Sequence, residues 1–191
     1  MSRPQRLPDE DLVAHLSGAF RRNGYEGTSL ADLSTATGMV KAALYHRFPA
    51  GKAGMAEAVE AAAGRDFVRL VIAPLQAGGT PSERIAAMAA GLMAYYAEGR
   101  NACLVEIFSI EATPEPIRRR LRAGVQGWVA AMAAVLAEAG VAPDTATRRA
   151  EDAVIRIQGA LVVSRALAER RHFIDAVAGL RDQLLPPGGP T

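Results

Sequence analysis

A short segment near the N-terminus holds the side chains best suited to hydrogen bonding with a polyanion. Residues 40–46 read VKAALYH, and Thr28 and Lys52 flank this stretch. Lysine, tyrosine, histidine and threonine side chains donate to phosphate oxygens or base edges, and small apolar groups fit the methyl group of thymine. The chemistry predicted for this segment is contact with double-stranded DNA.

Each residue of this segment can be given a role in such a contact. Lys41 is the charged group expected to contact DNA from a helix in the major groove, while Lys52 begins a helix whose free N–H groups also favour an anion. Small side chains permit close approach to the bases, and polar ones donate to phosphate. The predicted DNA-binding residues are Thr28, Ser29, Val40, Lys41, Ala42, Ala43, Tyr45, His46 and Lys52.

The same residues also have a purely structural interpretation. A three-helix stretch with a glycine turn is common in structural bundles. Tyr45 could belong to the core, and His46 and Lys52 could be solvated surface residues. Thr28 could do no more than precede a helix cap.

Three short helices must position these side chains. Pro8 and the acidic residues 9–11 begin the first helix, which ends at Asn23-Gly24. Ser29 and Asp32 have the spacing of a capping box and begin the second helix, and Gly38 provides the turn to a third helix over about 40–47. The inward-facing residues predict a shared core of Leu12, Leu16, Ala19, Phe20, Leu30, Leu33, Leu44 and Phe48.

The rest of the chain has a helical pattern as well. Hydrophobic residues make up 50% of the 191, and they are mainly Ala, Leu and Val rather than aromatic residues, which favours packed helices over sheets. Helices are predicted at about 52–75, 82–99, 102–111, 115–139, 144–170 and 172–185. We therefore predict an all-α fold, with an N-terminal three-helix helix-turn-helix DNA-binding domain and a larger C-terminal helical ligand-binding and dimerisation domain. The predicted ranges are 1–52 for the first domain, 53–185 for the second, 186–191 for a disordered tail, and 1–8 for a flexible arm within the first.

Aromatic and methionine side chains recur at helical spacing in the middle of the chain. Such side chains suit a flat, mostly apolar ligand. The predicted effector-binding residues are Leu92, Met93, Tyr96, Ile107, Phe108, Glu111, Trp128 and Met132. The alternative is packing, because Trp128 and Met132 also continue a regular core stripe over residues 117–136.

Residues 153–167 of the helix predicted over 144–170 carry two apolar stripes, and the final helix carries further apolar residues. A helix that is apolar on two sides must be buried on two sides, so one side can meet its own domain and the other a second subunit. We predict a two-fold homodimer through a four-helix bundle, with intrachain core as the alternative. The predicted interface residues are Ile155, Val162, Ala166, Phe173, Val177, Leu180 and Leu184.

Several classes of function are disfavoured by what the sequence lacks. Cys103 is the only cysteine, so no intrachain disulfide can form, and it is expected to be a small buried hydrophobe, with a redox-sensing thiol as the alternative. His15 and His172 have no partners at metal-ligand spacing, so we predict no metal and no cofactor. No catalytic fingerprint occurs, and an enzyme is not expected. With no apolar run long enough to span a bilayer, the protein is expected to be soluble and cytoplasmic, without a membrane partner.

The segment GYEGTSLADLSTATGMVKAALYHRFPAGK, residues 24–52, resembles the DNA-binding segment of TetR-type (TetR/AcrR) transcriptional regulators. Ten residues match the pattern of that family in order: Gly24, Tyr25, Thr28, Ser29, Leu33, Gly38, Leu44, Tyr45, Phe48 and Lys52. The segment FPAGK has one residue more than the usual F-x-x-K. This segment and the stretch CLVEIFSIEA at 103–112 resemble the LmrA/YxaF-like branch of the family. Ser34 stands where alanine is usual, and Val40 stands where serine is usual, which removes one hydroxyl that could bind phosphate.

The resemblance implies a repressor that binds double-stranded operator DNA as a homodimer. Its two reading helices would lie in successive major grooves, about 34–36 Å apart for half-sites one turn apart. It also implies a cavity for a small hydrophobic effector in the larger domain, and release from DNA when that effector binds. The alternative is a helix-turn-helix protein that is regulated by a protein partner, or is constitutive, without a small-molecule effector.

Overall fold

The computed structural model describes residues 9–185, and every secondary-structure element in this range is helical. The predicted all-α fold is therefore confirmed. The predicted arm over residues 1–8 and the predicted tail over 186–191 lie outside the described residues. The helices are α1 (Asp9–Gly27), α2 (Leu30–Thr37), α3 (Lys41–Arg47), α4 (Gly51–Phe67), the π-helical turn η1 (Val68–Ile72), α5 (Ala73–Gln76), α6 (Pro81–Tyr95), α7 (Leu104–Phe108), α8 (Glu115–Glu138), α9 (Pro143–Ala166), α10 (Arg171–Ala178) and α11 (Leu180–Leu184).

The chain divides into two compact units. The first comprises the residues up to Ala63 together with Leu104–Leu121, and the second comprises Gly64–Cys103 together with the residues from Arg122 onward. The first division falls inside α4, the second directly before α7 and the third inside α8. These units are defined by packing, whereas the predicted boundary at residue 52 separates parts expected to fold independently. That boundary stays a prediction.

The first unit is built around α1, which packs on α2 and on α7. Most of the residues predicted to face inward are buried there, Leu12, Leu16 and Phe20 among them, whereas Leu30 and Phe48 are only half-buried. Gly24 leaves the helical conformation with φ 72°, ψ 175°, and this break ends the regular part of α1 where the sequence predicted its end. Phe108 of α7 completes the core, with its ring 5.5 Å from that of Phe20 and 6.1 Å from that of Tyr25, both in edge-to-face contact.

The predicted helix boundaries differ from the structure in several places. The helices predicted over 82–99 and 144–170 are α6 and α9, which end four residues earlier, at Tyr95 and Ala166. The helix predicted over 52–75 is continuous but contains η1. In this π-helical turn the backbone hydrogen bonds join residues five apart, one more than in an α-helix. The helix predicted over 102–111 is only the five-residue α7, because residues 102–103 and 109–111 on either side of it are not helical. The last predicted helix is divided into α10 and α11 at Gly179.

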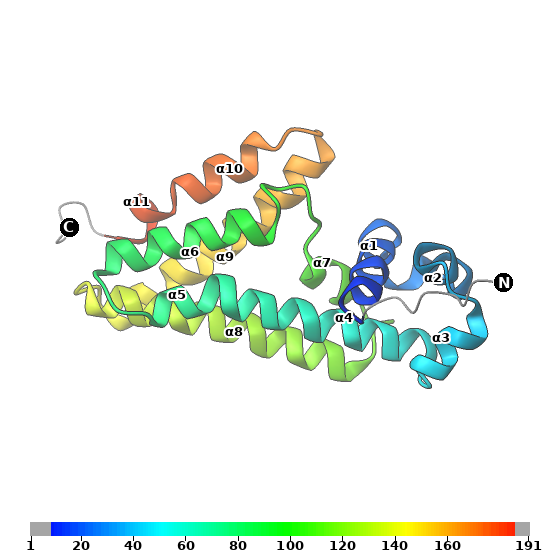
Figure 1. Ribbon diagram of the computed structural model, residues 1–191. Coiled ribbons are helices and arrows are strands. Elements are labelled where there is room, and N and C mark those ends of the chain that lie inside the picture. The colour runs from blue at the N-terminus through cyan, green and yellow to red at the C-terminus, as the bar shows by residue number, and fades with distance from the viewer. Residues whose placement is uncertain (1–8, 186–191) are drawn as a thin grey trace. The chain divides into compact units, whose positions relative to one another are not determined.

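In the second unit, α6 packs against η1, α5, α10 and α11, and α9 packs against α10 and α11 (Figure 1). Gly91 of α6 permits a close approach, because a Cβ atom there would lie 1.7 Å from the carbonyl oxygen of Leu70 in η1. An aromatic series lies in the same unit: the ring of Phe67 makes edge-to-face contacts with Trp128 and Tyr95, and Tyr96 makes them with Tyr95 and Phe173. The helices of this unit are thus held by large interlocking side chains.

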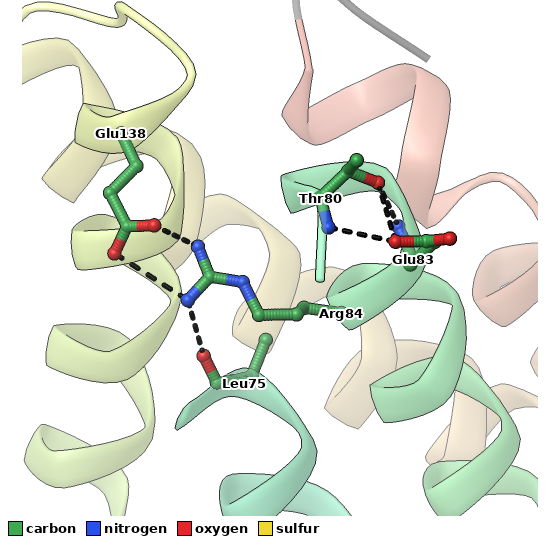
Figure 2. Close-up of polar contacts among 5 residues, drawn as sticks. All are labelled: Leu75, Thr80, Glu83, Arg84 and Glu138. Carbon is green, nitrogen blue, oxygen red and sulfur yellow. Dashed lines mark hydrogen bonds and ion pairs between the residues drawn. The ribbon is translucent and has the colours of Figure 1, made fainter. Parts of the chain in front are cut away.

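Arg84 fixes the turn between α5 and α6 (Figure 2). Its guanidinium donates to the carbonyl oxygen of Leu75 over 3.2 Å and forms an ion pair with Glu138 at the end of α8. Just before it, Thr80 caps α6 and forms a capping box with Glu83. One arginine therefore joins the ends of three helices within the second unit.

Candidate functional site

The turn between α2 and α3 is held by side-chain hydrogen bonds. The Ser29 hydroxyl accepts from the Asp32 amide over 3.2 Å, and the Asp32 carboxylate accepts from the Ser29 amide over 2.8 Å, which confirms the predicted capping box. Gly38 has the left-handed conformation, with φ 67°, as a tight helix-ending turn requires. Ser34 donates to the carbonyl oxygen of Met39, so the residue that departs from the usual alanine ties α2 to the turn.

Helix α3 presents one face to solvent and buries the other. Leu44 is fully buried, whereas Val40 is 69% and Tyr45 is 47% exposed. Lys41, Ala42 and His46 are also exposed, and Ala43 is half-buried. Val40 is the residue that precedes the helix, and it makes no side-chain cap, so its isopropyl group is available on the surface.

Thr28 differs from its predicted role as a phosphate donor. It is fully buried, and its hydroxyl donates to the carbonyl oxygen of Gly24. Because this hydroxyl is buried and directed at the Gly24 carbonyl, at the break in α1, it is not presented to a phosphate. The Ser29 hydroxyl is exposed, but it donates to the Asp32 carboxylate over 2.7 Å and caps α2.

Lys52 lies in the first turn of α4, as predicted, but its ammonium group contacts the backbone of the same chain. Its ammonium nitrogen donates to the carbonyl oxygens of Tyr25, at 3.0 Å, and Glu26, at 3.5 Å, and lies 4.6 Å from the centre of the Tyr25 ring. These contacts hold the start of α4 against the end of α1. The ammonium group is thus occupied by backbone carbonyls where a phosphate was expected.

The segment FPAGK, residues 48–52, forms the turn from α3 into α4. The Gly51 amide donates to the Phe48 carbonyl over 2.8 Å, and Gly51 has φ 62°. The Tyr45 ring lies against Gly51, since a Cβ atom there would be 3.2 Å from Cε1 of the ring. Gly51 was not among the predicted site residues. The segment FPAGK has one residue more than the usual F-x-x-K, and this extra residue was the only sign in the sequence that the turn differs here.

Two pKa shifts in this region have clear causes. Hydrogen bonds from Ser29 lower the pKa of Asp32, which keeps the carboxylate of the capping box charged. Burial raises the pKa of Tyr25, and the nearby negative charge of Glu57 raises it further. Tyr25 is therefore a neutral ring beneath the Lys52 ammonium at neutral pH.

The predicted effector-binding residues are distributed over both units. Leu92, Tyr96, Trp128 and Met132 are buried in the second unit, where Met93 is half-buried. Ile107 and Phe108 belong to the core of the first unit because α7 packs on α1, and Glu111 is exposed.

A buried polar group lies among the aromatic side chains of the second unit. The Tyr96 hydroxyl accepts a hydrogen bond from Gln158 over 3.2 Å and lies 3.5 Å from the Cys103 sulfur. Burial raises the pKa of Tyr96 well above its ordinary value, and Cys103 raises it further. Trp128 directs its N–H at the sulfur of Met88, 3.5 Å away.

The predicted dimer-interface residues fall into two groups. Phe173, Val177, Leu180 and Leu184 are buried inside the chain, because α10 and α11 pack on α6 and α9. This differs from the expectation that they face a second subunit, and it corresponds to the alternative of intrachain core. The residues on α9 do face solvent: Ile155 is 69% and Val162 is 45% exposed, and Ala166 is exposed.

Two open grooves of mainly apolar character lie on the second unit. One, of about 360 Å³, runs between α6 and α10 and is lined by Met93 and Ile174, among others. The other, of about 470 Å³, runs between α8 and α9 and is lined by Val129 and Ile155, among others. The second groove continues the exposed apolar side of α9.

Between residues 9 and 185, His, Cys, Asp and Glu side chains do not gather in threes at distances that could hold a metal ion. None of the helices in that range combines the length and the hydropathy that a membrane span requires.

Two family models match the chain. Residues 18–59 match the bacterial regulatory proteins of the tetR family, and residues 81–178 match the C-terminal domain of LmrA/YxaF-like transcriptional regulators. No curated protein matches the chain.

Solved structures of regulators have the same fold. A TetR transcriptional regulator from Legionella pneumophila is 17% identical, with a TM-score of 0.81 over 96% of this chain and 100% of that one. A TetR-family regulator from Agrobacterium tumefaciens is 22% identical, with a TM-score of 0.78 over 93% and 97%. AibR, in complex with isovaleryl coenzyme A and operator DNA, is 18% identical, with a TM-score of 0.69 over 94% and 98%.

Proposed function

The chain belongs to the TetR family of bacterial regulatory proteins, with a C-terminal domain of the LmrA/YxaF-like type, and from this premise we propose that it is a repressor released from its operator by a small, largely apolar effector. It is a transcriptional regulator, and its family and fold are those of regulators rather than of enzymes. Regulators of this family bind operator DNA and act as dimers.

The observation that carries the proposal is the exposed face of α3. A reading helix contacts base edges with the residues near its N-terminus, and here these are Val40, Lys41 and Ala42, all exposed. Tyr45 and His46 follow on the same helix with exposed polar groups that can donate to phosphate. We assign the DNA contacts to these five residues, because the polar groups of Thr28, Ser29 and Lys52 already have partners within the chain.

The exposed apolar side of α9 and its groove with α8 support a homodimer through these two helices. Contiguous apolar surface is characteristic of protein–protein interfaces. Two-fold symmetry would bring α8 and α9 of each protomer together as a four-helix bundle. The interface residues then include Val129, Ile155 and Val162, while the buried residues of α10 and α11 support the interface from behind.

The buried side chains of the second unit support an apolar effector that carries a polar group. Trp128 and Met132 are buried there beside a polar group in which the Tyr96 hydroxyl contacts the Cys103 sulfur and accepts from Gln158. An effector with a polar group would exchange its own hydrogen bonds for these contacts. The structural neighbour AibR was solved with both isovaleryl coenzyme A and operator DNA, which supports a ligand response on this fold. For release, the effector must bind the DNA-incompetent state better than the DNA-bound state.

Fluorescence anisotropy with DNA from upstream of the protein's own gene tests the DNA-binding proposal. We expect salt-dependent, sequence-specific binding, and a loss of about tenfold in affinity for Lys41→Ala and for Tyr45→Ala. Arg69→Ala is the control, because it removes an exposed cation from η1. Specific binding that both α3 variants retain at full strength would rule out the assignment to α3.

A thermal-shift screen of small apolar compounds tests the effector proposal. A compound that raises the melting temperature binds the native state, and an effector should also weaken DNA binding. If every stabilising compound left the DNA affinity unchanged, regulation by a small molecule would be rejected.

A further inference from the structure

Lys52 lies where the carbonyl groups at the end of α1 need donors. The last carbonyls of a helix have no N–H partner within it, and the break at Gly24 leaves the carbonyls of Tyr25 and Glu26 beyond the regular part of α1. The Lys52 ammonium donates to both. A cation is also favourable at this negative end of the helix dipole.

The Tyr25 ring gives the ammonium a second point of attachment. The nitrogen lies 4.6 Å from the ring centre, within the range of a cation–π contact. The ring itself is held by Phe20, whose ring is stacked at 6.1 Å, and by Phe108 at 6.1 Å. Because Tyr25 is part of the core, the position of Lys52 is set by the core of the first unit.

The neighbouring residue of α4 contacts α3. Tyr45 lies against the backbone of Gly51, directly before Lys52 in the chain. The first turn of α4 therefore contacts the end of α1 through Lys52. It contacts the Tyr45 ring of α3 through Gly51. A shift of this turn would move the Tyr45 ring.

We propose that Lys52 is a positioning residue for DNA recognition rather than a phosphate ligand. By holding the carbonyls of Tyr25 and Glu26, it fixes the first turn of α4 and, through Gly51, the orientation of Tyr45 on the reading face. This inference rests on the proposed DNA-binding function, and it differs from the phosphate contact that the sequence led us to expect for Lys52.

The salt dependence of DNA binding separates the two roles. Each phosphate contact contributes about 0.9 to the slope of log K against log salt, so its loss in both protomers lowers the slope of a dimer by about 1.8. We expect Lys52→Met to bind specific DNA about tenfold more weakly, which is the effect of losing a charge-assisted hydrogen bond. Its slope of log K against log salt should equal that of the wild-type protein. Lys41→Met is the matched control, because it removes a charge from the exposed face of α3 and should lower the slope.

Anisotropy titrations at several salt concentrations, well below the melting temperature of each variant, provide both quantities. A lower slope for Lys52→Met, similar to that of Lys41→Met, would overturn the proposal, and so would an unchanged affinity, which indicates a role in stability alone. If Lys52→Met does not fold, Lys52→Gln replaces it for the slope, since its side chain is uncharged but keeps an N–H donor for the carbonyls of Tyr25 and Glu26. We expect Lys52→Gln to keep the slope of the wild-type protein and to lose less affinity than Lys52→Met, and a lower slope for this variant would equally overturn the proposal. Absence of specific binding by the wild-type protein would instead count against the proposed function itself.

Discussion

Ser34 shows at the scale of one residue how a departure from a family pattern can be structural. Alanine is usual at this position in the DNA-binding segment that the chain resembles. Here the hydroxyl donates to the Met39 carbonyl, and Thr37 donates to the Leu33 carbonyl over 2.8 Å and accepts from the Met39 amide over 3.3 Å. Ser34 thus adds a hydrogen bond to the turn that orients α3, whereas Val40, the other departure, changes the surface of the reading helix.

Gly51→Ala is expected to lower both stability and DNA affinity. A left-handed conformation costs a residue with a Cβ atom about 1–2 kcal/mol, and the new Cβ atom would press on the Tyr45 ring at 3.2 Å. We expect a loss of unfolding free energy of about 2 kcal/mol in chemical denaturation and weaker binding in anisotropy titrations.

Gly140→Ala is the control for backbone strain at Gly51. Gly140 has φ 84° and no atom within 4 Å of the added Cβ position, and it lies in the turn between α8 and α9. Its substitution should lower stability without affecting DNA binding. Equal DNA affinities for the two variants would show that the contact between Gly51 and Tyr45 does not matter for recognition.

At the scale of elements, α2 and α6 begin in the same way. Ser29 with Asp32 and Thr80 with Glu83 each form a complete capping box. Hydrogen bonds from the cap residue lower the pKa of Asp32 and of Glu83 below their ordinary values of 3.8 and 4.5. Both helix starts therefore depend on an ionised carboxylate.

Acid should weaken both helix starts. Because the pKa of each carboxyl is lower in the folded state, its contribution to stability is complete above the pKa of the unfolded state and is lost as the pH falls through the folded value. Melting temperatures between about pH 6 and pH 3 should fall more steeply for the wild-type protein than for the double variant Ser29→Ala/Thr80→Ala. Parallel curves would show that the two cap hydroxyls do not contribute to the acid response, since the backbone N–H groups of both cap residues still donate to the carboxylates in the variant.

The π-helical turn η1 fits α6 only because Gly91 has no side chain. We expect Gly91→Ala to destabilise the protein by about 3 kcal/mol, at the upper end for overpacking, since the Cβ atom would overlap the Leu70 carbonyl oxygen. Gly124→Ala on α8 is the matched control, because nothing lies within 4 Å of the added atom, and it should stabilise by about 0.5–1 kcal/mol. Urea denaturation measures both changes, and a stable Gly91→Ala variant would show that η1 can move away from α6.

At the scale of the whole molecule, the aromatic residues form two separate clusters. Phe20, Tyr25 and Phe108 belong to the first unit. The cluster from Trp128 through Phe67 to Phe173 belongs to the second unit. The first cluster holds the ring that Lys52 contacts, and the second includes Tyr96 with its buried hydroxyl. The proposed DNA recognition and the proposed effector response therefore depend on different cores.

Ile155→Glu is expected to convert a dimer to a monomer. The substitution would bury a charge at each of two symmetry-related positions, which is costly without a partner. Light scattering after size exclusion should show the mass of one chain, with Val68→Glu, an exposed apolar residue of η1 that is 52% exposed, as the control that remains dimeric. A dimeric Ile155→Glu variant would exclude this side of α9 from the interface.

The sequence by itself determined the features that depend on near neighbours in the chain. Hydrophobic periodicity predicted an all-α fold, the spacing of Ser29 and Asp32 predicted a capping box, and Gly38 predicted the turn before α3. These features arise from backbone hydrogen bonds within a few residues, so the local pattern contains them. The exposed residues of α3 follow for the same reason once Leu44 is buried.

Only the tertiary structure decided the roles that depend on residues distant in sequence. Lys52 meets the carbonyls of Tyr25 and Glu26, Phe108 joins the core of the first unit, and Phe173 is buried inside the second. A local pattern shows that a side chain is apolar or charged, but it does not name the partner. Burial and ion pairing are set by which helices pack together, and that packing brings together segments far apart in the chain.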